Sequence, residues 1–566
     1  MVSAHKDHVL VGIPVLNETT DLRRNKSVWR TWNQLSRFQR SLIYMIFAVL
    51  FFMILYFIPN NTDSLIINYV ETTQKGGLKK SGSDEVPGQV LEEPSLKGGF
   101  DPVQVNTSRL FFGPTTQQQK AVVEAFKHAW QGYKEFAWGH DNLKPISKNY
   151  YDWFGLGLTI IDSLDTMYIM GLQREYEEAR TWVDKHLQFT HDRDVNLFEV
   201  TIRVLGSLLS IYHLTGDRMY LQKATNLGDR LLPCFETPSG VPYSDVNLHT
   251  MQAHPPRWSP DSSTAEVSTI QLEFRDLSRC TGDPKYEDAA AKVSVIIHGL
   301  KKTDGLVPIF INPQSGEFRS YSTITLGARG DSYYEYLLKQ WLQTGKTIDY
   351  LRDDYVAAIK GIEKHLAKKT VPNGLVFLGE ILAGGKDFKP KMDHLTCYLP
   401  GTLALGVHAG LPSKHLKLAD DLMNTCYQTY AQQPTFLAPE ITYFNMQGEN
   451  SNDLYVKTND AHNLLRPEFI ESLWYMYQLT GNTTYQEWGW KIFEAFETYT
   501  KVKNGYTSIG NVKSVTNLKR RDMMETFFLG ETLKYLYLLF SDDRKLIDLD
   551  KFVMNSEAHP LPIYSS

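Results

Sequence analysis

The sequence predicts an all-α protein whose largest part is an (αα)7 barrel, an α/α toroid in which seven outer helices surround seven inner ones. Three observations favour this fold. From about Phe111 onward, apolar residues recur at helical spacing, with little of the alternation that is typical of strands. A Thr-Gly pair recurs in the same region, and glycine suits the left-handed position that ends a helix. Apolar helices that begin with a carboxylate recur roughly every 65 residues, enough for two helices and their loops.

Composition limits the class of function. The chain has 566 residues, a hydrophobic fraction of 42% and a formal net charge of −5. It can therefore bury a large core, and it lacks the basic excess that is typical of nucleic-acid-binding proteins, so we expect no nucleic-acid partner. Four cysteines are too few for a disulfide scaffold, and no C-x-x-C pair suggests zinc.

The N-terminal part predicts a membrane anchor. Residues 1–40 carry an excess of lysine and arginine, and the uncharged run 41–60 is long enough to cross a bilayer as one helix. A core helix would not need the basic flank, and 40 preceding residues are long for a cleaved signal peptide. Basic residues before the span place the N-terminus in the cytosol. We therefore predict a cytosolic tail at 1–40 and a single-pass type II signal anchor at 41–60.

Residues 61–108 predict a flexible luminal stem, because Gly, Ser, Pro and charged residues dominate and aromatic residues are few. The barrel domain is then expected over 109–566. N-glycosylation sequons occur at Asn60, Asn106 and Asn482, and also at Asn17 and Asn25 in the tail, where we expect no modification.

The repeat predicts where the carboxylates of the barrel meet. Seven apolar runs begin at or near Asp152, Glu199, Glu266, Asp331, Asp393, Glu468 and Glu525. In a closed ring all inner helices run the same way, so these residues are expected to line one cavity at one mouth. An open solenoid is the alternative for the repeat. Ordinary stabilisation of a helix N-terminus is the alternative for any single carboxylate.

Several of these carboxylates come with features that a helix cap does not need. Arginines lie near three of them: Arg203 follows Glu199 by four residues, Arg329 precedes Asp331 by two, and Arg466 precedes Glu468 by two. Glu531 lies within an apolar helix, where a charge is costly unless it is paired or faces a cavity. Ser556 and Glu557 lie in a non-helical stretch near the C-terminus.

A mouth lined by carboxylates suits glycoside hydrolysis, in which one carboxylic acid protonates the leaving oxygen and another carboxylate activates water. It also suits a hard cation, which prefers oxygen ligands. Isoprenoid chemistry on a helical barrel is not indicated, because the chain has no D-D-x-x-D motif. The H-E-x-x-H and G-x-S-x-G motifs are also absent.

At these residues the chain resembles glycoside hydrolase family 47, the class I α1,2-mannosidases, from about Phe112 to Ile563, and within the family it is most similar to the endoplasmic-reticulum type. The resemblance is carried by WGHDNLKP (138–145), DSLDTMYIMGL (162–172), VNLFEVTIR (195–203), AHPPRWSPDSSTAEV (253–267), LGARGDSYYEYLLKQW (326–341), KMDHLTCYLPGTLALG (391–406), NLLRPEFIESLWY (463–475), ETFFLGETLKYLYLLF (525–540) and NSEAHPLP (555–562). So many long motifs in one order are highly specific.

The resemblance implies an (αα)7 barrel and a calcium-dependent, inverting exo-glycosidase that removes terminal α1,2-linked mannose from high-mannose N-glycans. It further implies N-glycan trimming in glycoprotein quality control and endoplasmic-reticulum-associated degradation, with quality-control adaptors as further partners. The expected location is the endoplasmic-reticulum membrane with a luminal catalytic domain, and the Golgi is the alternative.

The resemblance also implies roles for individual residues. Glu199 matches the acid that protonates the glycosidic oxygen through water, and Glu468 matches the base that activates the attacking water. Asp331 is a rival or helper for these roles, and Glu440 matches another acidic active-site position. Residues around the sugar and the ion match Arg203, Arg329, His394, Arg466, Glu471, Phe527, Glu531 and Glu557.

Two further features follow from the resemblance alone. Calcium is held through the hydroxyl and carbonyl of one residue, which is Thr in the family and Ser556 here. Serine keeps both oxygens but lacks the methyl group that stiffens χ1. Cys397 and Cys426 match the family's disulfide, whereas Cys234 and Cys280 are either buried thiols or a second pair.

Two other classes of function compete with an enzyme. The same barrel could be a glycan-binding adaptor that sorts misfolded glycoproteins, or it could have a purely structural role. The chain keeps every acidic position named above, which favours catalysis over binding alone.

Overall fold

The computed structural model describes residues 111–382, 387–448 and 452–564. The predicted cytosolic tail (1–40), signal anchor (41–60) and stem (61–108) lie outside these residues, as do the sequons at Asn17, Asn25, Asn60 and Asn106. Asn482 is exposed at the start of the turn between two helices.

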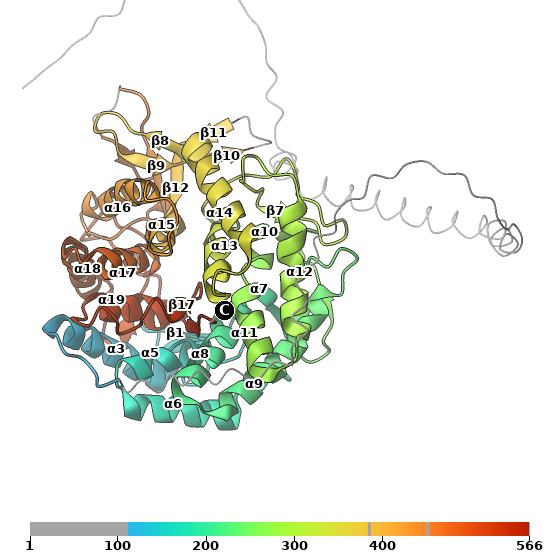
Figure 1. The fold of residues 1–566 in the computed structure, drawn as a ribbon. Helices are drawn as coiled ribbons and strands as arrows, with labels where there is room; N and C mark the ends of the chain where they lie inside the picture. Colours follow the sequence, from blue (N-terminus) through green and yellow to red (C-terminus); the bar gives the residue numbers. More distant parts are fainter. Residues whose placement is uncertain (1–110, 383–386, 449–451, 565–566) are drawn as a thin grey trace, which may run out of the picture. The chain divides into compact units, whose positions relative to one another are not determined.

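Two concentric layers of helices form a ring (Figure 1). The inner layer consists of α4 (Leu158–Asp162) with α5 (Leu164–Ile169), α7 (Leu197–Val200) with η2 (Thr201–Leu205) and α8 (Gly206–Thr215), α10 (Thr264–Val267) with α11 (Gln271–Thr281), α13 (Asp331–Gln343), α15 (Leu399–His408), α17 (Glu468–Thr480), and η8 (Phe528–Thr532) with α19 (Leu533–Leu539). The outer layer consists of α3 (Gln117–Phe136), α6 (Gln173–His186), α9 (Arg218–Leu231), α12 (Lys285–Gly299), α14 (Asp349–Gly361), α16 (His415–Ala431) and α18 (Thr484–Ala495).

The composition of each helix explains its layer. In α13 every residue after the first is buried, as expected for a helix that is enclosed on all sides. In α9 the buried residues follow one face: they are Tyr220, Ala224, Leu227, Gly228 and Leu231. Such an amphipathic helix covers the core with one stripe and leaves the other to solvent. The run Leu197–Thr215 is apolar and long enough to span a membrane. In the ring, however, 78% of its apolar stretch is buried, as expected for a core helix.

The ring is closed. The last inner helix, α19, packs against α17 on one side and against α3, the first outer helix, on the other. The π-helical turn η8 that precedes α19 contacts α4 and α5, so the seventh inner position meets the first. These contacts confirm the predicted barrel and exclude an open solenoid for the described residues.

The recurring Thr-Gly pairs end inner helices as predicted. Gly216 and Gly481 have φ of 73° and 71°, the left-handed conformation that closes a helix C-terminus without a Cβ clash. Asp217 then caps α9, because its side chain accepts a hydrogen bond from the Met219 backbone N–H.

Short strands, which the sequence pattern did not predict, lie in the loops between helices. Each has only two to four residues: β1 (Asn142–Lys144), β2 (Asn149–Tyr151), β3 (Asp194–Asn196), β4 (Asp245–Asn247), β5 (Ala253–His254), β6 (Ser262–Ser263), β7 (Phe310–Ile311), β8 (Ala367–Lys369), β9 (Val376–Leu378), β10 (Glu380–Leu382), β11 (Asp387–Lys389), β12 (Lys391–Asp393), β13 (Ile441–Phe444), β14 (Leu454–Tyr455), β15 (Lys501–Val502), β16 (Gly505–Tyr506), β17 (Phe552–Met554) and β18 (Pro560–Pro562). The remaining short helical turns are η3 (Leu232–Phe235), η4 (Ile362–Leu366), η5 (His394–Tyr398), η6 (Thr458–Asp460) and η7 (Phe496–Thr500). All named pairings are antiparallel. The core is therefore helical, and the strands are local hairpins between helices.

The C-terminal hairpin is the exception, because it fills the middle of the ring. β17 and β18 pair antiparallel with Val553 opposite Leu561, and they contact α8, α11 and α13. Figure 1 shows β17 and the C-terminus within the ring of helices. Asn555 and His559, which flank the turn between the strands, are fully buried. The hairpin thereby carries Ser556 and Glu557 to the inner ends of the helices.

Candidate active site

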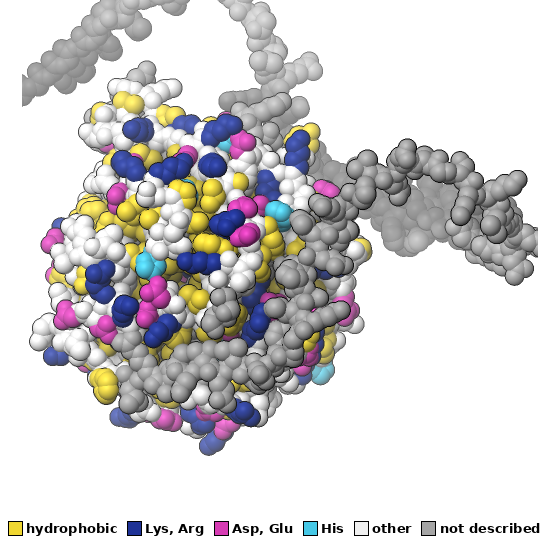
Figure 2. All heavy atoms as spheres, viewed as in Figure 1, with side chains coloured by type: hydrophobic (Ala, Val, Ile, Leu, Met, Phe, Trp, Pro, Cys, Tyr) yellow, Lys and Arg dark blue, Asp and Glu magenta, His cyan; other side chains and the backbone are white. Residues whose placement is uncertain are grey.

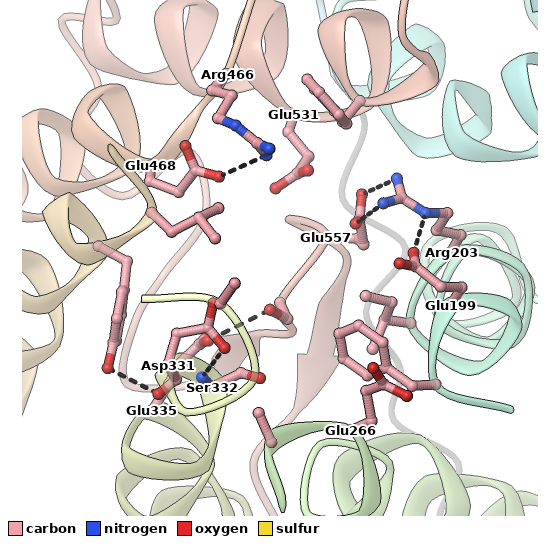
Figure 3. Close-up of a pocket in the computed structure, with 18 of the residues that line it drawn as sticks. Glu199, Arg203, Glu266, Asp331, Ser332, Glu335, Arg466, Glu468, Glu531 and Glu557 are labelled. Atoms are coloured by element: carbon pink, nitrogen blue, oxygen red, sulfur yellow. Dashed lines mark hydrogen bonds and ion pairs between the residues drawn. The ribbon is translucent and has the colours of Figure 1, made fainter. Parts of the chain in front are cut away.

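A cavity of about 330 Å³ lies where the inner helices begin. Eight carboxylates and three guanidinium groups line it. Figure 3 labels many of them, including Arg203 and Arg466. The carboxylates are those of Glu199, Glu266, Asp331, Glu335, Glu468, Glu471, Glu531 and Glu557, and the guanidinium groups are those of Arg203, Arg329 and Arg466. Ser556 and Phe527 also line the cavity. Residues from widely separated parts of the chain thus meet at one mouth, as the helical repeat predicts.

The starts of the inner helices position the first carboxylates. The Asn196 side chain accepts a hydrogen bond from the Glu199 backbone N–H at 3.0 Å, which caps α7. Asp331 and Glu468 are the first residues of α13 and α17. A carboxylate at a helix N-terminus is stabilised there by the unpaired backbone N–H groups and the helix dipole.

Two π-helical turns position further site residues. Arg203 lies in η2 and Glu531 in η8. A π turn inserts one extra residue into the helical turn, and such turns are frequent at functional sites. No sequence signal announces them, although the charge of Glu531 within an apolar run indicated a special environment.

Arg203 joins the two sides of the cavity wall. Its Nε donates to Glu199 Oε2 at 2.9 Å, and its two Nη atoms lie 2.9 Å from the two carboxylate oxygens of Glu557. Such a bidentate Arg–carboxylate pair fixes the orientation of both side chains and balances their charges. The guanidinium also lies over the ring of Phe527, with its Cζ 5.8 Å from the ring centroid.

Glu468 is held as a carboxylate. His394 Nδ1 lies 2.8 Å from Glu468 Oε2, and Arg466 Nη1 lies 3.6 Å from Glu468 Oε1. Burial by itself raises the pKa of Glu468, but the hydrogen bond from His394 and the positive charge of Arg466 outweigh it, so the pKa lies below its ordinary value. Glu468 is therefore ionised at neutral pH and can accept a proton.

Glu440 and His394 support the cavity without lining it. Arg466 Nε lies 2.8 Å from both carboxylate oxygens of Glu440, and the His394 backbone N–H donates to the Glu440 carbonyl at 2.9 Å. In the structure Glu440 therefore orients Arg466 and the start of η5, whereas Glu468 itself faces the cavity.

Asp331 has the opposite charge state. Burial raises the pKa of Asp331 to about 8, and the negative charges of Glu335 and Glu468 add to this against a hydrogen bond from the Ser332 backbone N–H. The Tyr398 hydroxyl donates to the Asp331 carbonyl at 2.8 Å and fixes the start of α13. Asp331 is therefore protonated at neutral pH and can give up a proton.

The floor of the cavity is formed by the turn between β17 and β18. The Ser556 backbone N–H donates to the Tyr336 hydroxyl at 3.2 Å, and Ser556 Oγ donates to Glu335 Oε2 at 3.3 Å. The Asn555 side chain accepts from the Glu557 and His559 backbone N–H groups at 2.9 Å each and so fixes the turn.

Burial raises the pKa of three carboxylates around this floor. Burial raises the pKa of Glu471 to about 8, although nearby Lys339 lowers it. Burial raises the pKa of Glu557 to about 7 against the charge of Arg203. Burial and the proximity of Glu557 raise the pKa of Glu531. Together with Ser556, these three carboxyl groups provide several oxygen atoms that could bind a cation.

The expectation that all seven helix-start carboxylates line the cavity is wrong for three of them. Asp152 accepts from the Asp141 backbone N–H and pairs with His140 near β2. Asp393 pairs with Lys391 at 2.9 Å, and Glu525 is not among the lining residues. Loop and hairpin contacts draw the first two away from the mouth.

The sequence pattern did not single out Glu335, which also lines the cavity. It lies one helical turn after Asp331 in α13, so both side chains project from one face of that helix. Arg203 likewise follows Glu199 by four residues. The same spacing after Asp331 is the sequence signal that indicates Glu335.

Arg329 occupies a strained backbone position at the cavity wall. Its φ is 71°, and its Cζ lies 4.4 Å from the ring centroid of Trp258 and 5.5 Å from that of Phe310. The cation–π contacts hold the guanidinium at the rim.

The cysteines agree with the sequence expectations. Cys397 and Cys426 form a disulfide that joins η5 to α16. Cys234 is buried and Cys280 partly buried, and neither is in a disulfide.

Comparison with known proteins gives one consistent result. Residues 125–563 match the model of glycosyl hydrolase family 47. The chain is 58% identical over 451 residues to the human endoplasmic reticulum mannosyl-oligosaccharide 1,2-alpha-mannosidase, a match that covers 79% of this chain and 64% of the relative. It is 55% identical over 502 residues to the rat protein of the same name, covering 88% of this chain and 76% of the relative.

A solved structure agrees. The alpha-1,2-mannosidase from Trichoderma reesei matches with a TM-score of 0.75 and 28% sequence identity, covering 80% of this chain and 100% of that chain. Sequence and structure therefore lead to the same conclusion: the chain belongs to glycosyl hydrolase family 47.

Proposed function

We propose that this chain is a calcium-dependent, inverting exo-glycosidase that hydrolyses terminal α1,2-linked mannose from high-mannose N-glycans of glycoproteins. The observation that carries the proposal is one cavity lined by both Glu468, which His394 and Arg466 contact at 2.8 and 3.6 Å, and Asp331, whose pKa burial raises to about 8. The human and rat relatives are named mannosyl-oligosaccharide 1,2-alpha-mannosidases, which supports the substrate class.

Glu468 is the proposed base. Glycoside hydrolysis with inversion needs a carboxylate that accepts a proton from the attacking water. Glu468 meets this need because His394 and Arg466 keep it ionised while it faces the cavity. The proton of the water passes to the Glu468 carboxylate as the oxygen attacks the anomeric carbon.

The proton for the leaving oxygen has two candidate sources. Glu199 lies across the cavity from Glu468 in Figure 3, which suits an acid on the opposite side of the sugar. Arg203 Nε lies 2.9 Å from Glu199 Oε2. Asp331, with its pKa of about 8, carries a proton at neutral pH and is the donor that its own pKa favours.

The floor of the cavity fits a calcium ion. Ser556 offers a hydroxyl and a carbonyl oxygen, and Glu335, Glu471, Glu531 and Glu557 are further oxygen donors along the cavity lining. Hard cations prefer such donors. When bound, calcium supplies a positive charge and open coordination positions for sugar hydroxyls. Ser556 is the residue we propose to hold it.

The cellular setting is proposed on the sequence and the names of the relatives. We propose that residues 41–60 anchor the chain in the endoplasmic-reticulum membrane as a single-pass type II protein, with the barrel in the lumen. There it would trim N-glycans for quality control and degradation of glycoproteins, together with adaptor proteins. The curated human and rat relatives are named endoplasmic reticulum enzymes.

The proposal is tested by a timed digestion, in which the full-length chain in detergent acts on a nine-mannose N-glycan. We expect release of free mannose, with the order of branches read by NMR, and a loss of release in Glu468→Gln. Binding of the glycan without any release in the wild type would overturn the hydrolase assignment in favour of a glycan-binding adaptor. Absence of both binding and release would favour a structural role.

A further inference from the structure

A chain of two hydrogen bonds runs from Glu468 into the core of the protein. His394 Nδ1 lies 2.8 Å from Glu468 Oε2, and His394 Nε2 lies 2.7 Å from the Tyr430 hydroxyl. Tyr430 is fully buried and does not line the cavity. The hydroxyl of Tyr430 thus acts on Glu468 only through the imidazole between them.

The position of Tyr430 is fixed by its surroundings. It lies in α16, one helical turn after Cys426, whose disulfide partner Cys397 follows His394 by three residues in η5. The Tyr430 ring also packs against Phe469, with the two ring centroids 5.4 Å apart. The covalent bridge therefore joins the two segments that carry the hydrogen-bonded pair.

The chemistry of the imidazole ring determines which atoms donate in these two hydrogen bonds. In a neutral histidine one ring nitrogen carries a proton and donates, and the other accepts. The ionised carboxylate of Glu468 can only accept, so Nδ1 must carry the proton. In the neutral ring Nε2 is then the acceptor, and the hydroxyl of Tyr430, 2.7 Å away, is the donor.

We propose that Tyr430 is a positioning residue that holds His394 in the tautomer with the proton on Nδ1, and that it thereby keeps Glu468 ionised. This inference rests on the proposed function, because Glu468 is the base only if the cavity hydrolyses a glycoside. Without the hydroxyl, the proton of His394 can move to Nε2. Nδ1 would then turn a lone pair toward the carboxylate, and the proton affinity of Glu468 would rise.

Other charges also face this network, and they remain in place when the hydroxyl is removed. Glu468 is close to Arg466 and Glu471 in its own segment, to Asp331 at the start of α13 and to Glu531 in η8. Tyr430 is close to Glu468 and Glu440. Because a Tyr430→Phe substitution alters none of them, a change in the pH profile can be assigned to the link through His394.

The test compares Tyr430→Phe with Tyr355→Phe in the full-length chain, after wild-type cleavage of the nine-mannose glycan has been measured. Tyr355 is a fully buried tyrosine in α14 whose hydroxyl lies 3.4 Å from the Thr402 carbonyl, outside the cavity. For Tyr430→Phe we expect a fall in kcat of about tenfold with little change in KM, and an upward shift of the acidic limb by about one pH unit. Tyr355→Phe should change neither.

Two further variants distinguish positioning from a merely structural role. In a His394→Ala background, Tyr430→Phe should cause no further change in the acidic limb, because the two residues act as one chain. Incorporation of 3,5-difluorotyrosine at position 430 keeps the shape of the ring and makes the hydroxyl a stronger donor. It should move the acidic limb downward, opposite to the shift in Tyr430→Phe.

The outcomes separate this inference from the proposed function. A wild type that releases no mannose refutes the proposed function, and with it the role given to Tyr430. An active wild type whose acidic limb and kcat are unchanged by Tyr430→Phe refutes the inference alone. So does an equal loss caused by Tyr430→Phe in the presence and absence of His394.

Discussion

Arg203 and Glu557, which are 354 residues apart in the chain, form a two-pronged ion pair at the cavity wall. Arg203 belongs to the second inner helical segment and Glu557 to the turn of the C-terminal hairpin. The same guanidinium also binds Glu199. This contact joins the end of the chain, which carries Ser556, to the ring of helices that carries the proposed catalytic residues.

Replacement of Arg203 by Met should destabilise the protein strongly, because it leaves Glu557 and Glu199 without their partner. Removal of one partner from a buried ion pair costs about 3–5 kcal/mol. We expect the loss in the free energy of unfolding measured by urea titration. Arg319→Met is the matched control, since Arg319 is half exposed in its pair with Asp261 and such pairs contribute about 1 kcal/mol or less. Equal losses in the two variants would contradict the account.

The pH dependence of kcat/KM should be bell-shaped. Glu468 accepts a proton only above its lowered pKa, so activity is lost as the pH falls through that value. Asp331 donates a proton only below its raised pKa, so activity is lost as the pH rises above about 8. Asp331→Asn should lower kcat by about 100-fold or more and remove the basic limb. Retention of the basic limb in Asp331→Asn, with its loss in Glu199→Gln, would transfer the role of proton donor to Glu199.

Calcium should raise the melting temperature, and more so at higher pH. Glu471 and Glu557, two of the oxygen donors named for the ion, have raised pKa values in the folded protein. The folded state therefore holds protons that the unfolded state releases, so stability falls as the pH rises from about 5 to 8. A bound cation reduces this loss of stability, because it favours the ionised carboxylates.

Ser556→Ala tests the residue that we propose to hold the ion. It removes the hydroxyl but not the carbonyl, so the calcium-induced rise in melting temperature should shrink, while the melting temperature in chelator should change little. Ser239→Ala, a loop hydroxyl outside the cavity, is the control. An undiminished calcium effect in Ser556→Ala would show that the ion binds elsewhere.

Replacement of both Cys397 and Cys426 by Ser should lower stability and activity together. The bridge closes a loop with a sequence separation of 29 residues, and loss of such a bridge costs about 2–4 kcal/mol. Because His394 lies in the same short helix as Cys397, its hydrogen bond to Glu468 should also loosen. Calorimetry and kcat check the two effects. Cys280→Ser, at a free thiol, should leave kcat unchanged, and a fall in kcat there but not in the double variant would refute the link.

The sequence predicted the ring and one end of its cavity because both follow from local patterns. Apolar helices that alternate with amphipathic ones close with the inner helices aligned, which brings the helix starts that carry Glu199, Asp331 and Glu468 to one mouth. The repeat could not show that loop and hairpin contacts turn Asp152 and Asp393 away. The short loop strands escaped prediction because two to four residues carry too little alternation to detect.

Three features of the site depended on contacts distant in sequence. The π turns at Arg203 and Glu531 arise from tertiary packing, and no residue pattern marks them. The passage of Ser556 into the ring depends on the buried Asn555 network. The charge states of Glu468 and Asp331 depend on burial and on neighbours such as His394, so two carboxylates with similar sequence contexts acquire opposite roles.

The anomeric form of the first mannose released is the most direct test of the central claim that Glu468 activates a water molecule in a single displacement. Proton NMR in the first seconds of digestion, before mutarotation, distinguishes the two forms. If Glu468 activates the water, β-mannose should appear first from the α-linked substrate, and its rate of appearance should be greatly reduced in Glu468→Gln. Initial release of α-mannose, or an equal rate in the variant, would contradict this claim.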